Sequence, residues 1–302
     1  MDFGKLQDIS GVDFTLPPEN LFTASILSSI NTPENPEVYI GPPIWANKDW
    51  VGKVYPSNAK EKDFLHYYIR QFNTIELNVT HYQSPTPAMI SRWKEEATKG
   101  FKFCPKFPQA ISHDRQLIGT EALTAEFCHA VLQLGDNLGR TFLQLSPAFE
   151  PKQLKTLEKY LKSLPPAFPV SVEFRHEKWF SNKAVWRETC TMLAELGVGT
   201  VMSDVSGRRD VLHMSLTNNS LMLRFVGNEL HPTDYTRADE WCLKISDWIK
   251  RGLRHIYIFI HCGDNKYAPE LTSYWIKNLN KNANLRIQEP KITPQVVQGS
   301  LF

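Results

Sequence analysis

The sequence predicts a (β/α)8 TIM barrel in a single domain with an N-terminal extension. Strand-like apolar segments and amphipathic helix-like segments alternate along the chain roughly eight times, the pattern of repeated β-then-α units. These units occupy about 250 residues, the usual size of such a barrel. A doubly wound open sheet is the competing fold, but it would usually need fewer strands and a glycine-rich first turn, and neither is evident. We therefore expect an extension at 1–36, the barrel at 37–282 and a tail at 283–302.

The first half of the chain supplies the extension and four of the units. Residues 1–36 are rich in Pro, Asn and Ser, so we expect them to pack on the outside of the domain or to be partly mobile, with one short helix at 21–30. Strands are expected at 38–41, 74–78, 101–105 and 141–145. Helices are expected at 63–72, 87–96, 120–134 and 151–164. Thr120 is suited to cap the third helix, and Pro151 to occupy the first position of the fourth.

The second half continues the same rhythm with one irregular stretch after residue 204. Strands are expected at 170–174, 199–204, 220–226 and 255–261. Helices are expected at 182–196, 237–251 and 267–280, and the first of these should stop at Gly197. The loop at 227–236 delays the helix that follows the seventh strand. In barrels such loops lie on the catalytic face, so this loop is expected near the site.

The amino-acid composition indicates a class of protein but does not indicate a function. A hydrophobic content of 42% and a charged content of 22% are typical of a soluble globular protein. The net charge of +2, with no dense run of Lys and Arg, does not indicate nucleic acid and does not exclude it. Five scattered cysteines without a C-x-x-C pair favour reduced thiols in a cytoplasm. No signal peptide and no run of about 18 apolar residues is evident, so we expect a cytoplasmic protein away from membranes.

The strand at 170–174 carries charge on one of its faces. Its apolar residues alternate with Ser171, Glu173 and Arg175, and because side chains alternate across a strand, these three share a face. Buried charges need a reason. One reading is an internal ion pair that locks the core. The other is a functional site at the carboxyl end of the strand.

The same alternation on the other strands brings further polar side chains into the barrel. If the apolar sets face the helices, the polar sets converge near the carboxyl rim. The convergent residues are Glu76, Asn78, Lys106, Gln144, Glu173, Arg175, Asp204, Arg224 and His261. Three carboxylates and three cations make a nearly neutral, densely charged pocket, which suits a small polar or anionic ligand carrying phosphate, carboxylate or several hydroxyls.

We assign provisional roles to this set. Glu76, Glu173 and Asp204 are the candidate catalytic acids and bases. The candidate substrate-binding residues are Asn78, Tyr82, Lys106, His113, Gln144, Arg175, Trp179, Arg224 and His261. Tyr82 and Trp179 could line the mouth or belong to the core. Histidines near strand ends could bind a divalent metal together with the carboxylates, but no compact motif supports this, so no metal ligand is assigned and no cofactor is required.

Taken together, these residues resemble the DUF72 (YecE-like) family, TIM-barrel proteins of unassigned activity. The similarity runs from about residue 39 to 280. It is carried by Ile40-Gly41 with Trp45 and 49–50, by 72–78 with Thr80 and Tyr82, by 101–106, 111–113 and 143–145, and by 172–176 with Trp179. The resemblance implies the barrel and the convergent residues. It implies no reaction, because this fold hosts many chemistries.

Two classes of function fit these residues. The first is an enzyme, a hydrolase or isomerase, that acts on a small phosphorylated or polyhydroxylated substrate by acid–base chemistry through Glu76, Glu173 and Asp204. Its variant is a metal-dependent isomerase or a phosphodiesterase or nuclease-like enzyme using the same carboxylates. The second is a non-catalytic protein that binds a metabolite or nucleic acid in the same pocket.

Overall fold

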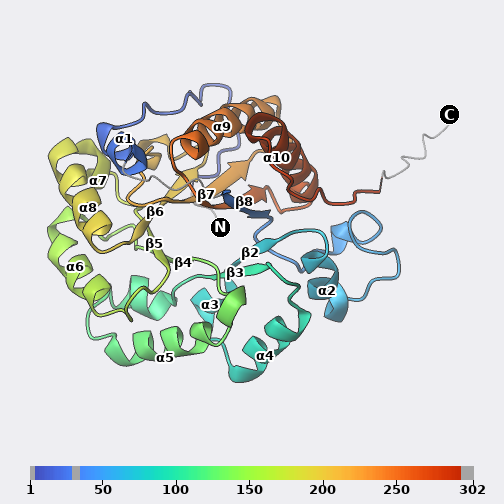
Figure 1. Ribbon diagram of the computed structural model, residues 1–302, viewed down its shortest axis with the longest axis horizontal. Helices are drawn as coiled ribbons and strands as arrows, with labels where there is room; N and C mark the ends of the chain where they lie inside the picture. Colours follow the sequence, from blue (N-terminus) through green and yellow to red (C-terminus); the bar gives the residue numbers. More distant parts are fainter. Residues whose placement is uncertain (1–3, 29–34, 294–302) are drawn as a thin grey trace.

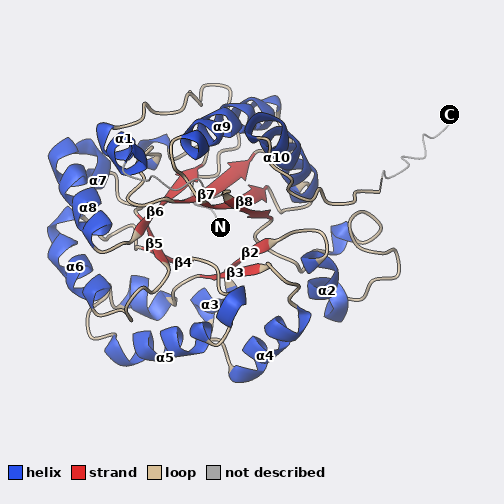
Figure 2. Ribbon diagram, viewed as in Figure 1, coloured by secondary structure: helices blue, strands red, loops and turns tan. Residues whose placement is uncertain are grey.

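The chain forms a ring of eight parallel strands surrounded by helices (Figures 1 and 2). The computed structural model describes residues 4–28 and 35–293. The strands are β1 (Glu37–Gly41), β2 (Thr74–Leu77), β3 (Lys102–Pro105), β4 (Thr141–Gln144), β5 (Val170–Glu173), β6 (Gly199–Asp204), β7 (Ser220–Gly227) and β8 (His255–Cys262). Six of them pair in the order β1-β8-β7-β6-β5-β4, and β2 pairs with β3. The predicted barrel is confirmed.

The ring is closed between β3 and β4 by single bridges instead of a continuous ladder. Phe103 pairs with Leu138 and Lys106 pairs with Phe142, both in parallel. In addition, the amide of Phe107 donates to the carbonyl of Phe142 at 3.0 Å. The second bridge joins the residue after the carboxyl end of β3 to the first half of β4, so it fixes the backbone of Lys106 where β3 ends.

A side-chain amide closes the ring between β1 and β2. The Oδ1 of Asn73 accepts from the amide of Ile40, and its Nδ2 donates to the carbonyl of Val38, both at 2.8 Å. The two groups of the Asn73 side chain thereby replace a strand partner for β1. The strands also approach closely at Gly41, where a Cβ atom would lie 2.5 Å from the carbonyl oxygen of Thr74. Glycine is therefore required at this position.

The helices form the outer layer (Figure 2). They are α1 (Leu21–Ser28), α2 (Phe64–Ile69), α3 (Val79–Tyr82), α4 (Pro87–Glu96), α5 (Glu121–Leu132), α6 (Leu154–Lys162), α7 (Lys178–Ser181), α8 (Lys183–Glu195), α9 (Pro232–Lys250) and α10 (Ala268–Ala283). All seven helices expected after a strand are present. The short helices α3 and α7, which follow β2 and β5 directly, are not among the predicted elements, because four residues are too few for a periodic pattern.

Helix ends differ from the prediction where capping decides them. Asn182 caps α8 by accepting from the amides of Ala184 and Val185. Helix α9 begins at Pro232, five residues before the predicted start, because the side chain of His231 caps it. The predicted cap at Thr120 is wrong, since its side chain makes no capping hydrogen bond. The last two residues of the helix expected at 21–30 lie outside the described part of the chain.

The interior of the barrel is apolar at its base and polar at its carboxyl rim. The lower layer is a small cluster of buried side chains, Tyr39, Cys104, Phe142, Val201, Met222, Tyr257 and Phe259. The alternate residues of β8, Ile256, Ile258 and Ile260, belong to the larger core under the helices. The predicted alternation on this strand is therefore confirmed, and it directs His261 into the barrel above Phe259.

The N-terminal extension covers two different parts of the barrel. Residues near α1 lie on its outside, as expected, and Thr23 Oγ1 there donates to the carbonyl of Met214 at 2.8 Å. By contrast, Lys5 and Ile9 line the cavity at the barrel mouth, a position that the sequence did not predict. No described helix has the length and apolarity that crossing a membrane requires.

Candidate functional site at the carboxyl rim

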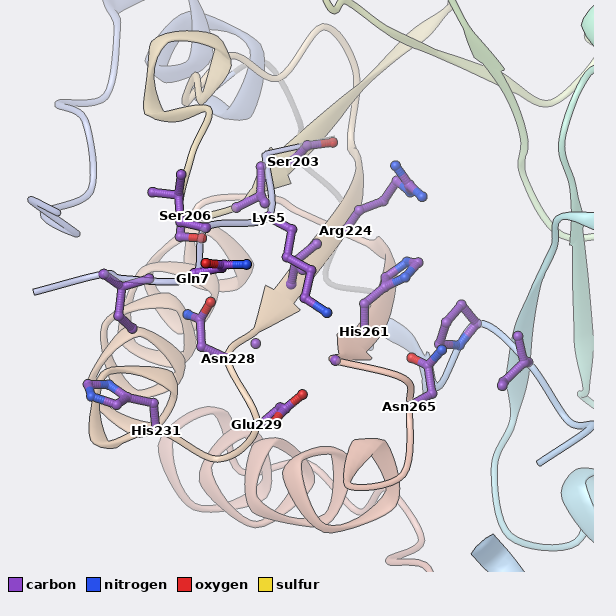
Figure 3. Close-up of a pocket in the computed structure, with 18 of the residues that line it drawn as sticks. Lys5, Gln7, Ser203, Ser206, Arg224, Asn228, Glu229, His231, His261 and Asn265 are labelled. Atoms are coloured by element: carbon purple, nitrogen blue, oxygen red, sulfur yellow. The ribbon is translucent and has the colours of Figure 1, made fainter. Parts of the chain in front are cut away.

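A cavity of about 570 Å³ opens at the carboxyl ends of the strands. The polar side chains that line it include Lys5, Asn78, Tyr82, Arg175, Ser203, Arg224, Asn228, Glu229, His231 and His261. Figure 3 shows Lys5 extending from the N-terminal segment into the space between Arg224, His261 and Asn228. The cavity lining carries three cations, Lys5, Arg175 and Arg224, and one carboxylate, Glu229.

Glu76 and Arg224 form the centre of the site. Because side chains alternate along β2 and β7, both side chains point into the barrel. There the Arg224 guanidinium donates two hydrogen bonds to the Glu76 carboxylate. Arg224 Nε lies 3.0 Å from Glu76 Oε2, and Arg224 Nη2 lies 2.9 Å from Glu76 Oε1. Burial opposes ionisation of Glu76, which is 1% exposed, but Arg224 and then His261 outweigh it and hold the pKa of this carboxyl well below its usual range. Glu76 is therefore a permanent anion that fixes Arg224.

Glu173 is shared by two arginines. Its Oε1 accepts from Ser203 Oγ at 2.5 Å, from Arg175 Nη2 at 2.7 Å and from Arg224 Nη1 at 3.2 Å. Burial raises the pKa of Glu173, but Arg175 and Arg224 outweigh burial and lower the pKa to about 2. Arg224 thus bridges the two glutamates, and its own pKa is raised because their attraction exceeds the cost of its burial. Both carboxylates lie behind the arginines and hold them toward the cavity.

A histidine at the end of β8 completes this network. His261 Nε2 lies 3.1 Å from Glu76 Oε2, and the side chain is 17% exposed. Asn78 is adjacent: its Nδ2 donates to Glu76 Oε1 at 2.7 Å, while its buried Oδ1 has no hydrogen-bond partner among the described residues. The sequence placed Asn78 on the strand, but β2 ends at Leu77 and Asn78 begins the turn into α3.

A second group of predicted residues lies beside the arginines, toward β3 and β4. Arg175 Nη2 donates to Gln144 Oε1 at 3.1 Å, and Gln144 Nε2 lies 3.4 Å from His113 Nε2. His113 comes from an unpredicted turn of π-helix at Ala110–Asp114. Burial, together with Lys106 and Arg175, lowers the pKa of His113 and thus favours its neutral form.

Lys106 is buried without a carboxylate in contact. It is 1% exposed, and among the described residues no carboxylate oxygen lies within 4 Å of its Nζ, which instead lies 6.0 Å from the ring centre of Phe142. Burial, together with Arg224, lowers the pKa of Lys106 to about 8, against a partial opposing effect of Glu173. Lys106 is therefore a buried cation at the edge of the charged network that loses its proton more readily than an exposed lysine.

Asp204 does not face the cavity, so the predicted direction of this side chain is wrong. It is fully buried on the outer side of β6, where its carboxylate accepts from Arg237 Nη2 at 2.7 Å and Trp241 Nε1 at 2.6 Å and pairs with Arg209. Its neighbour Ser203 faces inward instead. Because one face of β6 carries Val201 and the other Met202, the sequence pattern could not distinguish them.

Trp179 also lies away from the cavity. Its ring is fully buried beneath α7, close to Phe149 and Phe174, and its Nε1 donates to the carbonyl of Phe149 at 2.8 Å. The prediction that it binds substrate is therefore not supported by its position, and it is a core residue. Tyr82, by contrast, lines the cavity and is 75% exposed at its rim.

Several cavity residues are not among the predicted ones. Ser203 could have been found by assigning the inward face of β6 correctly. Asn228 and Glu229 come from the loop after β7, which the sequence placed on the catalytic face without naming residues. Lys5 lies far from the others in sequence, and no local pattern marks it.

The described residues offer no preformed cluster for a metal ion. No group of three or more His, Cys, Asp and Glu side chains in residues 4–28 and 35–293 has the arrangement to hold one. Both oxygens of Glu76 accept from Arg224, and Oε2 also lies beside His261 Nε2. The five cysteines are free and buried, and none lines the cavity.

Comparison with known proteins identifies the family of the chain. The sequence model described as "Protein of unknown function DUF72" matches residues 39–295. The chain belongs to the DUF72 family. It is 31% identical over 283 residues to the UPF0759 protein YecE of Escherichia coli K12, covering 88% of this chain and 100% of that protein. It is also 23% identical to the UPF0759 protein YunF of Bacillus subtilis 168, covering 81% of this chain and 83% of that protein.

The fold of the family agrees with the architecture seen here. The crystal structure of a DUF72 family protein from Enterococcus faecalis V583 matches with a TM-score of 0.64 at 15% identity, over 83% of this chain and 99% of that chain. At this identity the likeness concerns the fold alone. The DUF72 match begins at residue 39, so the N-terminal segment that carries Lys5 into the cavity precedes the matched region.

Proposed function

We propose that this DUF72 chain is an enzyme that acts on a small phosphorylated or polyhydroxylated substrate at the carboxyl rim of the barrel. The observation that carries this proposal is the pair of arginines, Arg175 and Arg224, held at the cavity surface by two ionised glutamates behind them. Guanidinium groups suit carboxylate and phosphate, and their fixed position lowers the cost of ordering them on binding. Hydroxyl groups of the substrate find partners in Asn78 and Ser203.

The acid–base role falls to His261 in this proposal. The two glutamates are ionised at neutral pH and fully engaged with arginines, which makes them poor proton donors. His261 lines the cavity and is held by Glu76 at 3.1 Å, the arrangement in which a carboxylate orients an imidazole for proton transfer. Glu76 then orients the histidine, and Glu173 keeps Arg175 in place. Asp204, which faces α9, has no part in the reaction.

Non-catalytic binding of the same class of ligand is the second candidate. The observation that favours it is that both glutamates are engaged by arginines, which makes these two carboxylates poor carriers of a proton. Both candidate functions require an anion to bind at the arginines, so anion binding does not distinguish them. Conversion of a substrate does, because only the enzyme would convert it.

The test has a binding arm and a turnover arm. Inorganic phosphate is titrated into the protein by calorimetry and soaked into crystals, and a panel of phosphorylated and polyhydroxylated metabolites is screened for conversion. We expect phosphate beside Arg175 and Arg224. We also expect His261→Gln to abolish turnover while phosphate affinity changes by less than about fivefold, the effect of one partly exposed contact. His129→Gln, an exposed change on α5, is the matched control.

The outcomes distinguish the candidates. Phosphate bound only on the outer helices would contradict the anion site itself. Binding at the arginines without any conversion on the panel would favour the non-catalytic protein. Full turnover in His261→Gln would remove the acid–base role assigned to this histidine.

A further inference from the structure

The segment at 4–9 crosses the mouth of the barrel and forms part of its wall. Lys5, Leu6, Gln7 and Ile9 all line the cavity, and Figure 3 shows the Lys5 side chain reaching into it beside Arg224 and His261. The loop after β6 faces the same cavity with Val205 and Ser206. The cavity is therefore walled by the barrel on one side and by this segment on the other.

Two hydrogen bonds between described residues join the segment to the loop after β6. The carbonyl of Gly4 accepts from the amide of Gly207 at 2.8 Å and from Ser206 Oγ at 3.3 Å. Lys5, Leu6 and Gln7 are exposed, although they contribute to the cavity wall. The segment thus contacts the loop after β6 through the Gly4 carbonyl and the Leu6 side chain, which is 41% exposed.

Gly207 is the docking point of the segment. A Cβ atom at this position would lie 2.8 Å from the carbonyl oxygen of Gly4 and 3.0 Å from Leu6 Cγ. Its backbone does not occupy the left-handed region, so an alanine is compatible with the local conformation and clashes only with the segment. The lack of a side chain at Gly207 is what lets the segment lie across the mouth.

We propose that residues 4–9 form a strap that carries Lys5 over the mouth of the barrel as an additional cation for the anionic group of the ligand. This inference rests on the proposed anion site at Arg175 and Arg224. Lys5 approaches the same space from the opposite side, so a ligand held there is contacted by cations from both walls. That arrangement suits a group with more than one negative charge, such as a phosphate dianion. Because the strap precedes the region matched by the family, it adds a determinant of specificity to the common barrel.

The first experiment measures phosphate affinity by calorimetry in the full chain at low salt. We expect Lys5→Glu to weaken binding about tenfold, as reversal of one partly exposed charge would, and Lys5→Ala about threefold. Lys155→Glu makes the same change of net charge on the outer helix α6 and should leave the affinity nearly unchanged. Gly207→Ala should weaken phosphate binding about as much as Lys5→Ala. The double variant should bind phosphate little more weakly than either single variant, because both substitutions remove the same contact between Lys5 and the ligand.

The second experiment does not depend on a bound ligand. Carbethoxylation of His261 by diethylpyrocarbonate is followed by peptide mass spectrometry, with exposed His129 as the internal reference. If the strap covers the mouth, Gly207→Ala should raise the rate at His261 at least about twofold relative to His129, since a displaced strap admits the reagent.

The results separate this inference from the proposed function. If the wild-type protein binds phosphate and Lys5→Glu binds it as tightly as Lys155→Glu, the role of Lys5 is overturned while the anion site stands. If the wild type binds no phosphate, the anion site fails, and the charge role of Lys5 fails with it. An unchanged rate at His261 in Gly207→Ala would overturn the strap as a cover.

Discussion

Replacing Glu173 by Gln tests whether one carboxylate neutralises two buried arginines. The substitution keeps the shape of the side chain and removes its charge. Arg224 retains Glu76 as a partner, whereas Arg175 loses the carboxylate that lies 2.7 Å from its Nη2. Breaking a buried ion pair by removing one partner costs about 3–5 kcal/mol, because the remaining charge stays buried. Asp204 cannot compensate, since it faces the opposite side of β6.

The pKa of Glu173 supplies a second estimate of the same free energy. The arginines hold it at about 2, against a usual value of 4.5. At about 1.4 kcal/mol for each pH unit, this depression corresponds to about 3 kcal/mol of stability. Because the pKa is lower in the folded state, this stability is fully present above pH 4.5 and is lost as the pH falls toward 2. About 1 kcal/mol should remain at pH 3.

The assay is urea unfolding of the wild type and Glu173→Gln at pH 7 and pH 3. We expect the free energy of unfolding to differ by about 3 kcal/mol at pH 7 and by about 1 kcal/mol at pH 3. Arg175→Met combined with Glu173→Gln is the control, since it strands no charge and should recover much of the loss. A Glu173→Gln protein as stable as the wild type at pH 7 would refute the reasoning.

Three further predictions concern residues at the edge of the site. Asp204→Asn should cost about 3 kcal/mol because Arg209 and Arg237 lose their shared carboxylate and Arg237 keeps only the longer contact with Asp234 at 3.5 Å, with phosphate affinity unchanged; weaker phosphate binding in a folded variant would return Asp204 to the site. Trp179→Phe should cost about 1–3 kcal/mol because the carbonyl of Phe149 loses its donor, and a loss of affinity without loss of stability would contradict its place in the core. Lys106→Met should raise the free energy of unfolding at pH 7 by removing a buried cation. This gain should shrink between pH 8 and 10.5, where the wild-type lysine is neutral in the fold but still charged when unfolded; a gain that is constant with pH would argue against the lowered pKa.

The local periodicity of the sequence was sufficient to predict the barrel and the centre of the site. Alternating strands and helices are a property of short segments, so eight units could be recognised without knowing how they pack. Alternation along β2, β5, β7 and β8 likewise directed Glu76, Glu173, Arg224 and His261 to one face, because on these strands the opposite face is plainly apolar. In the structure these four residues do meet, because Arg224 donates to both glutamates and His261 contacts Glu76.

Only the tertiary structure decided the rest, for reasons that lie outside any local pattern. Both faces of β6 carry apolar residues, so the direction of Asp204 depended on Arg237 and Trp241 in a distant helix. The position of Lys5 depended on a backbone contact between Gly4 and Gly207, about two hundred residues apart. The periodicity of a segment indicates which side of a helix or strand is apolar. It does not indicate the partners of a buried charge or the segment that covers a cavity, because these depend on contacts between elements that come together only when the chain folds.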